Sequence, residues 1–180
     1  IFVADATQST KNHGLFINFI EYCEKNKKKI KAQYITDINV LEKKYKLPKN
    51  LENVNLSFNH NLNPENLNIL FNKCKINLIL SGRDACPRTI SESLAAGCYN
   101  VCLNTLSDGK NYYKKKMGEI IKLEKSEMVV LSSHSISYKP SEILFEKILK
   151  TLSKKHNHQS ISKKSLEKYN VNSLVNRLTL

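Results

Sequence analysis

Two carboxylates, Asp84 and Glu92, flank a segment with the features of an anion-binding site. An apolar run ends at Leu80, a turn-forming sequence follows, and Pro87 favours the first turn of a helix. The backbone amides of residues Arg88–Ile90 would then lie at the helix N-terminus, where they have no partner within the helix. These amides, together with the helix dipole, make a place for a phosphate group.

The two carboxylates limit what else such a ligand can carry. A carboxylate is repelled by a bound diphosphate, but it can accept hydrogen bonds from hydroxyl groups. The segment therefore suits a ligand that has a diphosphate centre and a polyol at each end. A nucleotide sugar has this layout.

The elements that must position this segment alternate between strand and helix. Apolar runs predict strands at Ile1–Ala4, Ile30–Ile35, Asn53–Phe58, Ile76–Leu80, Tyr99–Leu103 and Glu119–Leu123, and a short one at Met128–Leu131. Helical spacing and capping residues predict helices at His13–Lys25 and Val40–Lys46, from Asn63-Pro64-Glu65 onward, and at Arg88–Ala96, which Gly97 ends. The alternation predicts a Rossmann-like, doubly wound parallel sheet of about six strands with helices on both faces.

The predicted topology places two loops opposite each other. In doubly wound sheets the ligand lies beyond the carboxyl ends of the strands, where the winding direction reverses. If the strand order is the common 3-2-1-4-5-6, the first and fourth strands are neighbours at that point. The loops Asp5–Gly14 and Ser81–Arg88 would then face each other across one crevice.

The C-terminal part of the chain reads as helical. Pro140 precedes a predicted helix that carries its apolar residues on one face. Lys154–Ser162 is predicted to be a polar linker, and Ser165–Leu178 a final helix. We therefore treat residues 1–180 as a single lobe, with an α/β core at 1–139 and C-terminal helices at 140–180.

Composition limits which partners and which cellular compartment are expected for this protein. The net charge of +13 favours anionic partners, although lysine is spread along the chain and much of it is expected on the solvated surface. An odd number of cysteines, without a C-x-x-C pair, argues against a secreted disulfide framework and favours the cytoplasm. His156 and His158 are expected at the surface, because no cluster of further ligands completes a metal site. No apolar run is long enough to span a membrane, while peripheral contact with an anionic membrane stays open as an alternative.

The acidic pair belongs to a longer pattern. The stretch Asp84-Ala-Cys-Pro-Arg-Thr-Ile-Ser-Glu92, followed by Ser-Leu-Ala-Ala-Gly97, resembles the E-x7-E motif of GT-B glycosyltransferases. More narrowly, it resembles the retaining family 4 group, whose pattern runs E-G-x-P-x-x-x-x-E-A-x-A-x-G. Thr10-Lys11-Asn12, the approach at Asn63–Ile79, the turn Ser107-Asp108-Gly109 and the C-terminal helices are similar to that family as well.

The resemblance implies a lobe that binds a UDP or GDP sugar and supplies a hexose-type sugar, with no required cofactor or metal. Glu92 would hold the ribose hydroxyls, and Asp84 would face hydroxyls of the transferred sugar. Lys11 would pair with the diphosphate and stabilise charge on the leaving group. The implied catalytic residues are Lys11 and Asp84, and the implied donor-binding residues are Arg88, Thr89, Ile90 and Glu92.

Three positions depart from the family pattern. Asp84 stands where the family has Glu, so its carboxylate has a shorter reach, and Ala85 stands where the family has Gly. Residues Ala4–Thr7 lack the Arg that the family carries shortly before its lysine, and Arg88 is a candidate to compensate. These departures bear on the choice of sugar and on the transfer step.

The family's enzymes have two lobes, and the match here is to the C-terminal one. We expect the N-terminal acceptor lobe to be absent from this chain, which alone would bind donor and transfer sugar slowly or not at all. The acceptor, whether glycan, lipid or protein, is left open.

Two alternatives belong to other classes. The departures favour a catalytically degenerate nucleotide-sugar-binding module. The charge favours a basic nucleic-acid-binding α/β domain, but we do not expect a nucleic-acid partner because no basic-aromatic reading motif occurs. The sequence contains neither a G-x-G-x-x-G after the first strand nor a Walker lysine motif, which argues against dehydrogenases and P-loop enzymes.

Overall fold

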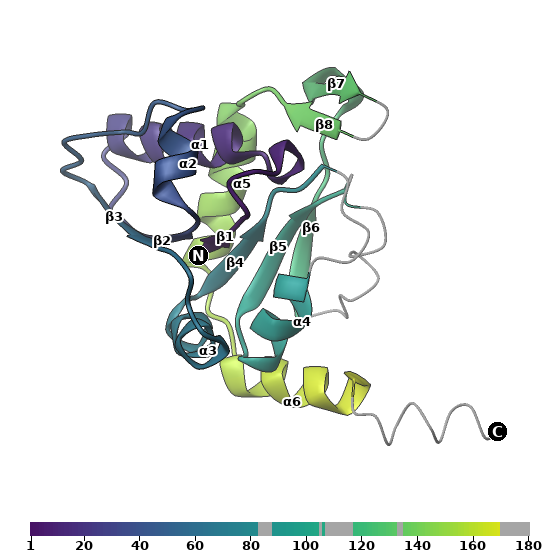
Figure 1. The fold of residues 1–180 in the computed structure, drawn as a ribbon. Coiled ribbons are helices and arrows are strands. Elements are labelled where there is room, and N and C mark those ends of the chain that lie inside the picture. The colour runs from purple at the N-terminus through teal and green to yellow at the C-terminus, as the bar shows by residue number, and fades with distance from the viewer. Residues whose placement is uncertain (83–87, 105, 107–116, 133–134, 170–180) are drawn as a thin grey trace.

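A six-stranded parallel sheet forms the centre of the computed structural model, which describes residues 1–82, 88–104, 106, 117–132 and 135–169 (Figure 1). The strands are β1 (Phe2–Val3), β2 (Ile30–Ile35), β3 (Val54–Asn59), β4 (Ile76–Ile79), β5 (Tyr99–Leu103) and β6 (Gly118–Ile121). Their order is β3-β2-β1-β4-β5-β6, and all of these pairings are parallel. The predicted Rossmann-like sheet is confirmed, and its order is the one that the switch-point prediction required.

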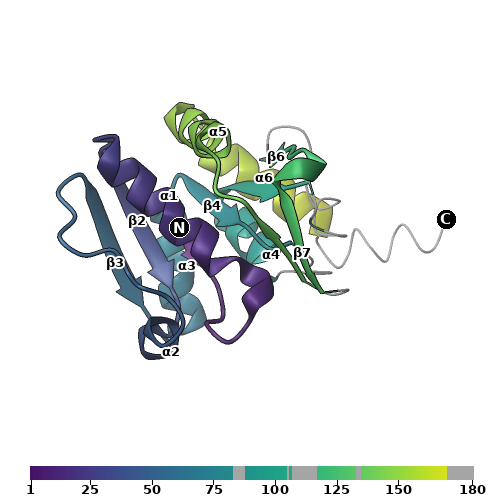
Figure 2. The same ribbon diagram turned by 90° about the horizontal axis from the view of Figure 1, so that it is seen from above.

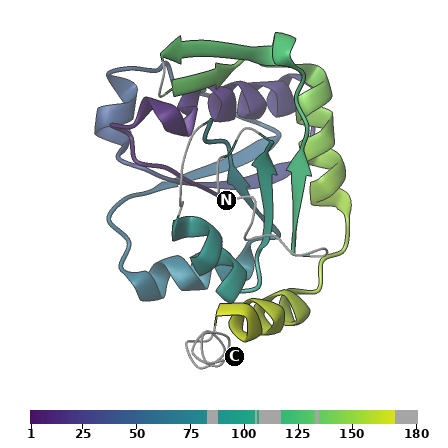
Figure 3. The same ribbon diagram turned by 90° about the vertical axis from the view of Figure 1, so that its right-hand side faces the viewer.

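Helices surround the sheet (Figures 2 and 3). They are α1 (His13–Lys25), α2 (Ile38–Glu42), α3 (Pro64–Lys73), α4 (Arg88–Ala95), α5 (Glu142–Ser153) and α6 (His158–Tyr169). Apolar residues of α1 and α5 form one core with the sheet, while those of α3 and α4 pack in two other clusters. α6 packs on α4, below it in the view of Figure 1, and its Ile161 joins the cluster that α4 forms with β4 and β5.

β4 shows why the sequences of the sheet strands are runs of apolar residues. Ile76 and Leu78 point into the core shared with α1 and α5, whereas Ile79 packs with α4 residues on the other side. Because successive side chains of a strand point to opposite faces and both faces are covered, both sets are apolar. Asn77 is the polar exception in this strand, and it is fully buried.

Two helix starts differ from the prediction because side chains cap them. α2 begins at Ile38 rather than Val40, since the Asp37 carboxylate accepts hydrogen bonds from the amides of Asn39 and Val40 at 3.0 and 3.3 Å. α6 begins at His158, inside the predicted linker Lys154–Ser162, where the Asn157 side chain accepts from the Ser160 amide at 2.9 Å. The predicted linker is therefore confirmed for Lys154–Asn157 and wrong from His158 onward. The predicted helix Ser165–Leu178 overlaps α6 as far as Tyr169, and its remainder lies outside the described residues.

A hairpin separates the sheet from the C-terminal helices. After the 3-10 turn Lys125–Glu127, β7 (Met128–Ser132) pairs antiparallel with β8 (Ser135–Tyr138). The predicted short strand at Met128–Leu131 is confirmed as part of β7, while β8 was not predicted. β8 lies beside a second 3-10 turn, Ser9–Lys11, which follows β1.

The two C-terminal histidines are not the surface residues that the sequence suggested. Both are half-buried. The His156 ring stacks on Tyr99 with ring centroids 4.0 Å apart, and its Nε2 lies 3.0 Å from the Thr151 carbonyl. Burial lowers the pKa of His156 below its ordinary value. His156 is half-buried because α6 packs against α4, which brings the connection after α5 against the start of β5.

Two further observations concern the cysteines and the helices. Cys23, Cys74 and Cys98 carry free thiols. Among the described helices, none combines the length and the apolar character that crossing a bilayer requires.

Gly97 sits where α4 meets α6. It has a φ of 80°, and a Cβ added there would lie 2.4 Å from the His158 carbonyl oxygen. Nearby, the Ser162 hydroxyl donates a 2.6 Å hydrogen bond to the Ala95 carbonyl. The glycine therefore ends α4, as predicted, and also permits the close approach of the α6 backbone.

Gly97→Ala should destabilise the protein by at least about 2 kcal/mol, because the left-handed backbone and the backbone clash both oppose a Cβ. Gly14→Ala is the matched control, since its Cβ would meet a Tyr45 ring atom at an ordinary 3.4 Å. Thermal unfolding of both variants checks this. Equal melting temperatures for Gly97→Ala and the parent protein would contradict the packing of α6.

Candidate functional site

The turn between β1 and α1 is organised by Asp5. Its carboxylate accepts hydrogen bonds from the Thr7 amide at 2.9 Å, the Thr7 hydroxyl at 2.7 Å and the Gln8 side chain at 3.2 Å. The bond from the Thr7 amide is the main reason why the pKa of Asp5 lies below its ordinary value. A 3-10 turn, Ser9–Lys11, follows and places the half-buried Lys11 immediately before α1.

This turn is joined to the end of β4. The buried Asn12 side chain donates a 2.7 Å hydrogen bond to the Leu80 carbonyl, and the Gly82 amide donates to the Thr10 carbonyl at 3.2 Å. Within the described residues, the segments after β1 and β4 therefore meet, as the strand order predicted. Lys11 lies between the two residues that make these contacts.

α4 is held against the sheet by a buried polar network. Asn77 of β4 and Asn100 of β5 are register partners, and the Asn77 amide donates to the Asn100 side-chain oxygen at 2.8 Å. Ser93 of α4 accepts from Asn77 at 3.1 Å and lies 2.9 Å from the Asn100 oxygen. All three are fully buried. The network also reaches the carbonyls of Thr89 and Ile90 in the first turns of α4.

The predicted site residues on α4 lie as follows. Arg88 is the first residue of the helix and is exposed, and Thr89 is half-buried. The Ile90 side chain is in the core, so only its backbone could contact a ligand. Glu92 is exposed one turn into the helix. Asp84 lies outside the described residues, as do Ala85, Pro87 and Ser107-Asp108-Gly109.

Sequence reasoning missed three positions that support this edge of the sheet. Asn77 and Asn100 interrupt apolar strands, and His13 begins an apolar helix face. His13 is 1% exposed, with Nδ1 facing the Tyr34 hydroxyl and Nε2 lying 2.9 Å from the Asp5 carbonyl. A polar residue inside an apolar run is the signal that could have found them, because a buried polar group needs a partner.

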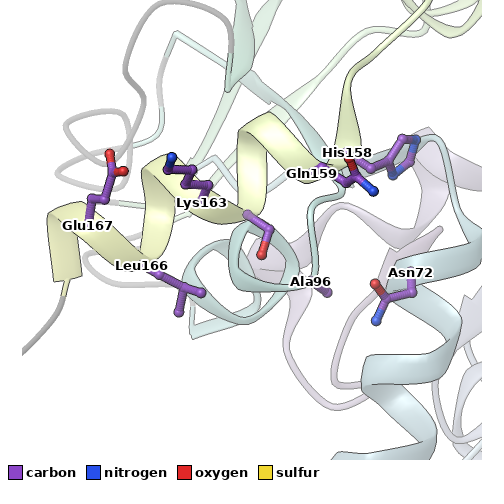
Figure 4. A pocket seen from close by; sticks show the side chains of 8 residues that line it. Asn72, Ala96, His158, Gln159, Lys163, Leu166 and Glu167 are labelled. Atoms are coloured by element: carbon purple, nitrogen blue, oxygen red, sulfur yellow. The ribbon is translucent and has the colours of Figure 1, made fainter.

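A groove of about 620 Å³ lies elsewhere, between α3, α4 and α6 (Figure 4). It is lined by Asn72, Ala96, His158, Gln159, Ser162, Lys163, Leu166 and Glu167. Of the predicted site residues that the structure describes, none lines it. The groove is lined by Ala96, directly after the end of α4, whereas the donor prediction concerns the first turn of that helix.

Metal binding was not expected. In the part of the chain that the structure describes, no group of three or more His, Cys, Asp or Glu side chains is arranged to hold a metal ion.

Comparison with known proteins supports the fold. No family model and no curated protein sequence matches the chain. Among solved structures, 39 chains match. One belongs to the crystal structure of the GtfA/B complex, a glycosyltransferase complex, with a TM-score of 0.66 and 9% identity over 99% of this chain.

The fold of this chain is similar to that of the part of the GtfA/B chain that it matches. At this identity the likeness concerns the fold alone, and this chain spans 34% of the length of the GtfA/B chain that it matches. It assigns neither the retaining family 4 nor a donor.

Ser93→Ala should destabilise the protein by about 1–2 kcal/mol, which corresponds to a fall in melting temperature of about 2–8 °C. The alanine leaves the buried amides of Asn77 and Asn100 without their shared hydroxyl. Ser91→Ala on the same helix is the control, because that half-exposed hydroxyl contacts the Arg88 carbonyl at 2.9 Å. Calorimetry that gave the two variants equal losses would contradict a special role for the network.

Stability should fall as the pH drops below about 6.5, the ordinary pKa of histidine. Burial lowers the pKa of His13, an effect that Lys44 reinforces and the Asp5 contacts oppose. Between the ordinary and the lowered pKa the unfolded chain binds the proton and the folded chain does not, so protonation favours unfolding. Melting temperatures between pH 7 and pH 5 should decline less steeply in His13→Gln. Parallel declines would show that His13 contributes nothing.

Proposed function

We propose that this chain is the donor-binding lobe of a retaining glycosyltransferase that transfers a hexose-type sugar from a nucleotide diphosphate sugar to an acceptor. The observation that carries the proposal is the junction of two segments at the switch point of the sheet. Asn12 and Thr10 contact Leu80 and Gly82, which brings the turn holding Lys11 to the start of the acidic motif. Doubly wound folds bind their ligands at this position.

The roles of the residues follow from charge and from their places on the fold. Lys11 pairs with the diphosphate and stabilises the negative charge that develops on the leaving group. The amides of Arg88–Ile90 face the phosphates from the first turn of α4, which the buried network holds in place. Glu92 accepts hydrogen bonds from the ribose, and Asp84 from the transferred sugar.

The remaining parts of the reaction need a second lobe or partner. The structural neighbour is itself a complex. We propose that the acceptor, a glycan, lipid or protein, is bound by a lobe or partner outside these 180 residues. The reaction requires no cofactor or metal in this proposal, and it takes place in the cytoplasm.

Calorimetric titration with UDP and GDP tests the proposal. One of the two should bind, and Glu92→Gln should weaken that binding about 10- to 100-fold, because charge-assisted hydrogen bonds to hydroxyl groups become neutral ones. Glu21→Gln is the control, since Glu21 is an exposed carboxylate in the middle of α1.

Two results would contradict the proposal. If neither nucleotide binds while the protein binds nucleic acid with strong salt dependence, the basic surface and not the donor site accounts for the function. Binding of a nucleotide diphosphate that Glu92→Gln leaves unchanged would remove Glu92 from the site.

A further inference from the structure

His13 connects the core of the sheet to the turn that carries Lys11. It is the first residue of α1 and is 1% exposed, as is its partner Tyr34 in β2. On the other side of the ring, Nε2 contacts the Asp5 carbonyl at 2.9 Å. The imidazole therefore bridges a strand and a turn that lie on different segments of the chain.

The chemistry of the two partners sets the tautomer of the ring. A carbonyl oxygen can only accept a hydrogen bond, so Nε2 carries the hydrogen and donates it to Asp5. Nδ1 then has a lone pair, which accepts from the Tyr34 hydroxyl. The hydrogen bonds run in one direction, from Tyr34 through His13 to the backbone of Asp5.

Aromatic neighbours restrict the ring. Its centroid lies 6.1 Å from that of Phe2, 6.1 Å from that of Tyr34 and 5.9 Å from that of Tyr45. Since these side chains come from β1, β2 and the segment after α2, the imidazole is enclosed from several directions. A close-packed interior gives such a ring little freedom to rotate.

The contact with Asp5 extends through the turn to Lys11. The Asp5 carbonyl accepts from the Gln8 amide at 3.1 Å as well as from His13, and the Gln8 carbonyl accepts from the Lys11 amide at 3.2 Å. The backbone position of Lys11 is thus linked to the imidazole by consecutive hydrogen bonds. Asn12, the next residue, is tied to Leu80.

We propose that His13 is a positioning residue, which holds the turn at Asp5–Asn12 in the shape that lets Lys11 bind the diphosphate of the donor. It touches no ligand itself and acts through the Asp5 carbonyl. The inference rests on the proposed function of this edge as a nucleotide diphosphate site. It adds a requirement for a neutral side chain that accepts a hydrogen bond from Tyr34 and donates one to Asp5.

The chain offers substitutions that separate hydrogen bonding from packing. His13→Leu keeps an apolar side chain in the space but removes both hydrogen bonds. His13→Gln supplies an oxygen for the Tyr34 hydroxyl and an amide hydrogen for the Asp5 carbonyl, so it should restore nucleotide binding. Tyr34→Phe removes only the donor to Nδ1 and serves as a milder second variant. Ile148→Ala, on the buried face of α5, is a control that loses stability without touching the turn.

Calorimetric titration with UDP and GDP measures the effect at a temperature where every variant is folded by circular dichroism. His13→Leu should raise the Kd of the bound nucleotide at least about tenfold, while His13→Gln and Ile148→Ala stay within about threefold. The Kd of Tyr34→Phe should lie between those of His13→Leu and His13→Gln. Without nucleotide, the amide resonances of Gln8 and Lys11 should shift in His13→Leu and return toward the parent positions in His13→Gln.

Two results would overturn the inference. Parent-like affinity in a folded His13→Leu protein would show that the turn needs no such link. Equal losses in His13→Leu and His13→Gln would show that the ring itself, and not its hydrogen bonds, is required. Failure of the parent protein to bind either nucleotide would instead overturn the proposed function on which the inference rests.

Discussion

The hydrogen bond from the Asn12 side chain to the Leu80 carbonyl joins residues 68 positions apart, and the carboxyl edge of the sheet is built around it. Asn12 has a φ of 56°, a left-handed backbone that Asn tolerates better than most residues. This conformation ends the 3-10 turn and starts α1. With its amide buried, Asn12 needs a partner, and the end of β4 supplies one.

The direction of α4 depends on a second set of buried polar groups. Asn77, Ser93 and Asn100 form hydrogen bonds with one another in an interface that is otherwise apolar. An apolar interface tolerates small rotations of a helix, whereas a hydrogen-bonded cluster holds one geometry. The polar cluster thus specifies where the first turn of α4 lies relative to β4 and β5.

His13 also stabilises the carboxyl edge of the sheet, through the turn that follows β1. It links Tyr34 to the Asp5 carbonyl, while Asn12 links the following position to Leu80. The turn that carries Lys11 is therefore held through neighbouring residues at the start of α1.

The location of the site could largely be predicted from the sequence, but the hydrogen bonds that hold the site in place could not. The alternation of elements leaves few strand orders for a doubly wound sheet, so the meeting of the segments after β1 and β4 followed from connectivity. The partners of His13 and Asn77 could not be read in this way, because Tyr34 is 21 residues from His13 and Asn100 is 23 residues from Asn77. Periodicity describes the face of one element and not the element that packs on it.

By itself, the sequence determined the elements of the core. His13–Lys25, Ile30–Ile35 and Tyr99–Leu103 have the predicted bounds, because the period of apolar residues is a property of neighbouring residues. Tertiary structure alone decided the start of α6, the stacking of His156 on Tyr99, and the approach of the His158 backbone to Gly97. The physical reason is that these features depend on which distant surface is available to bury a helix of low apolar content, and no local pattern records that surface.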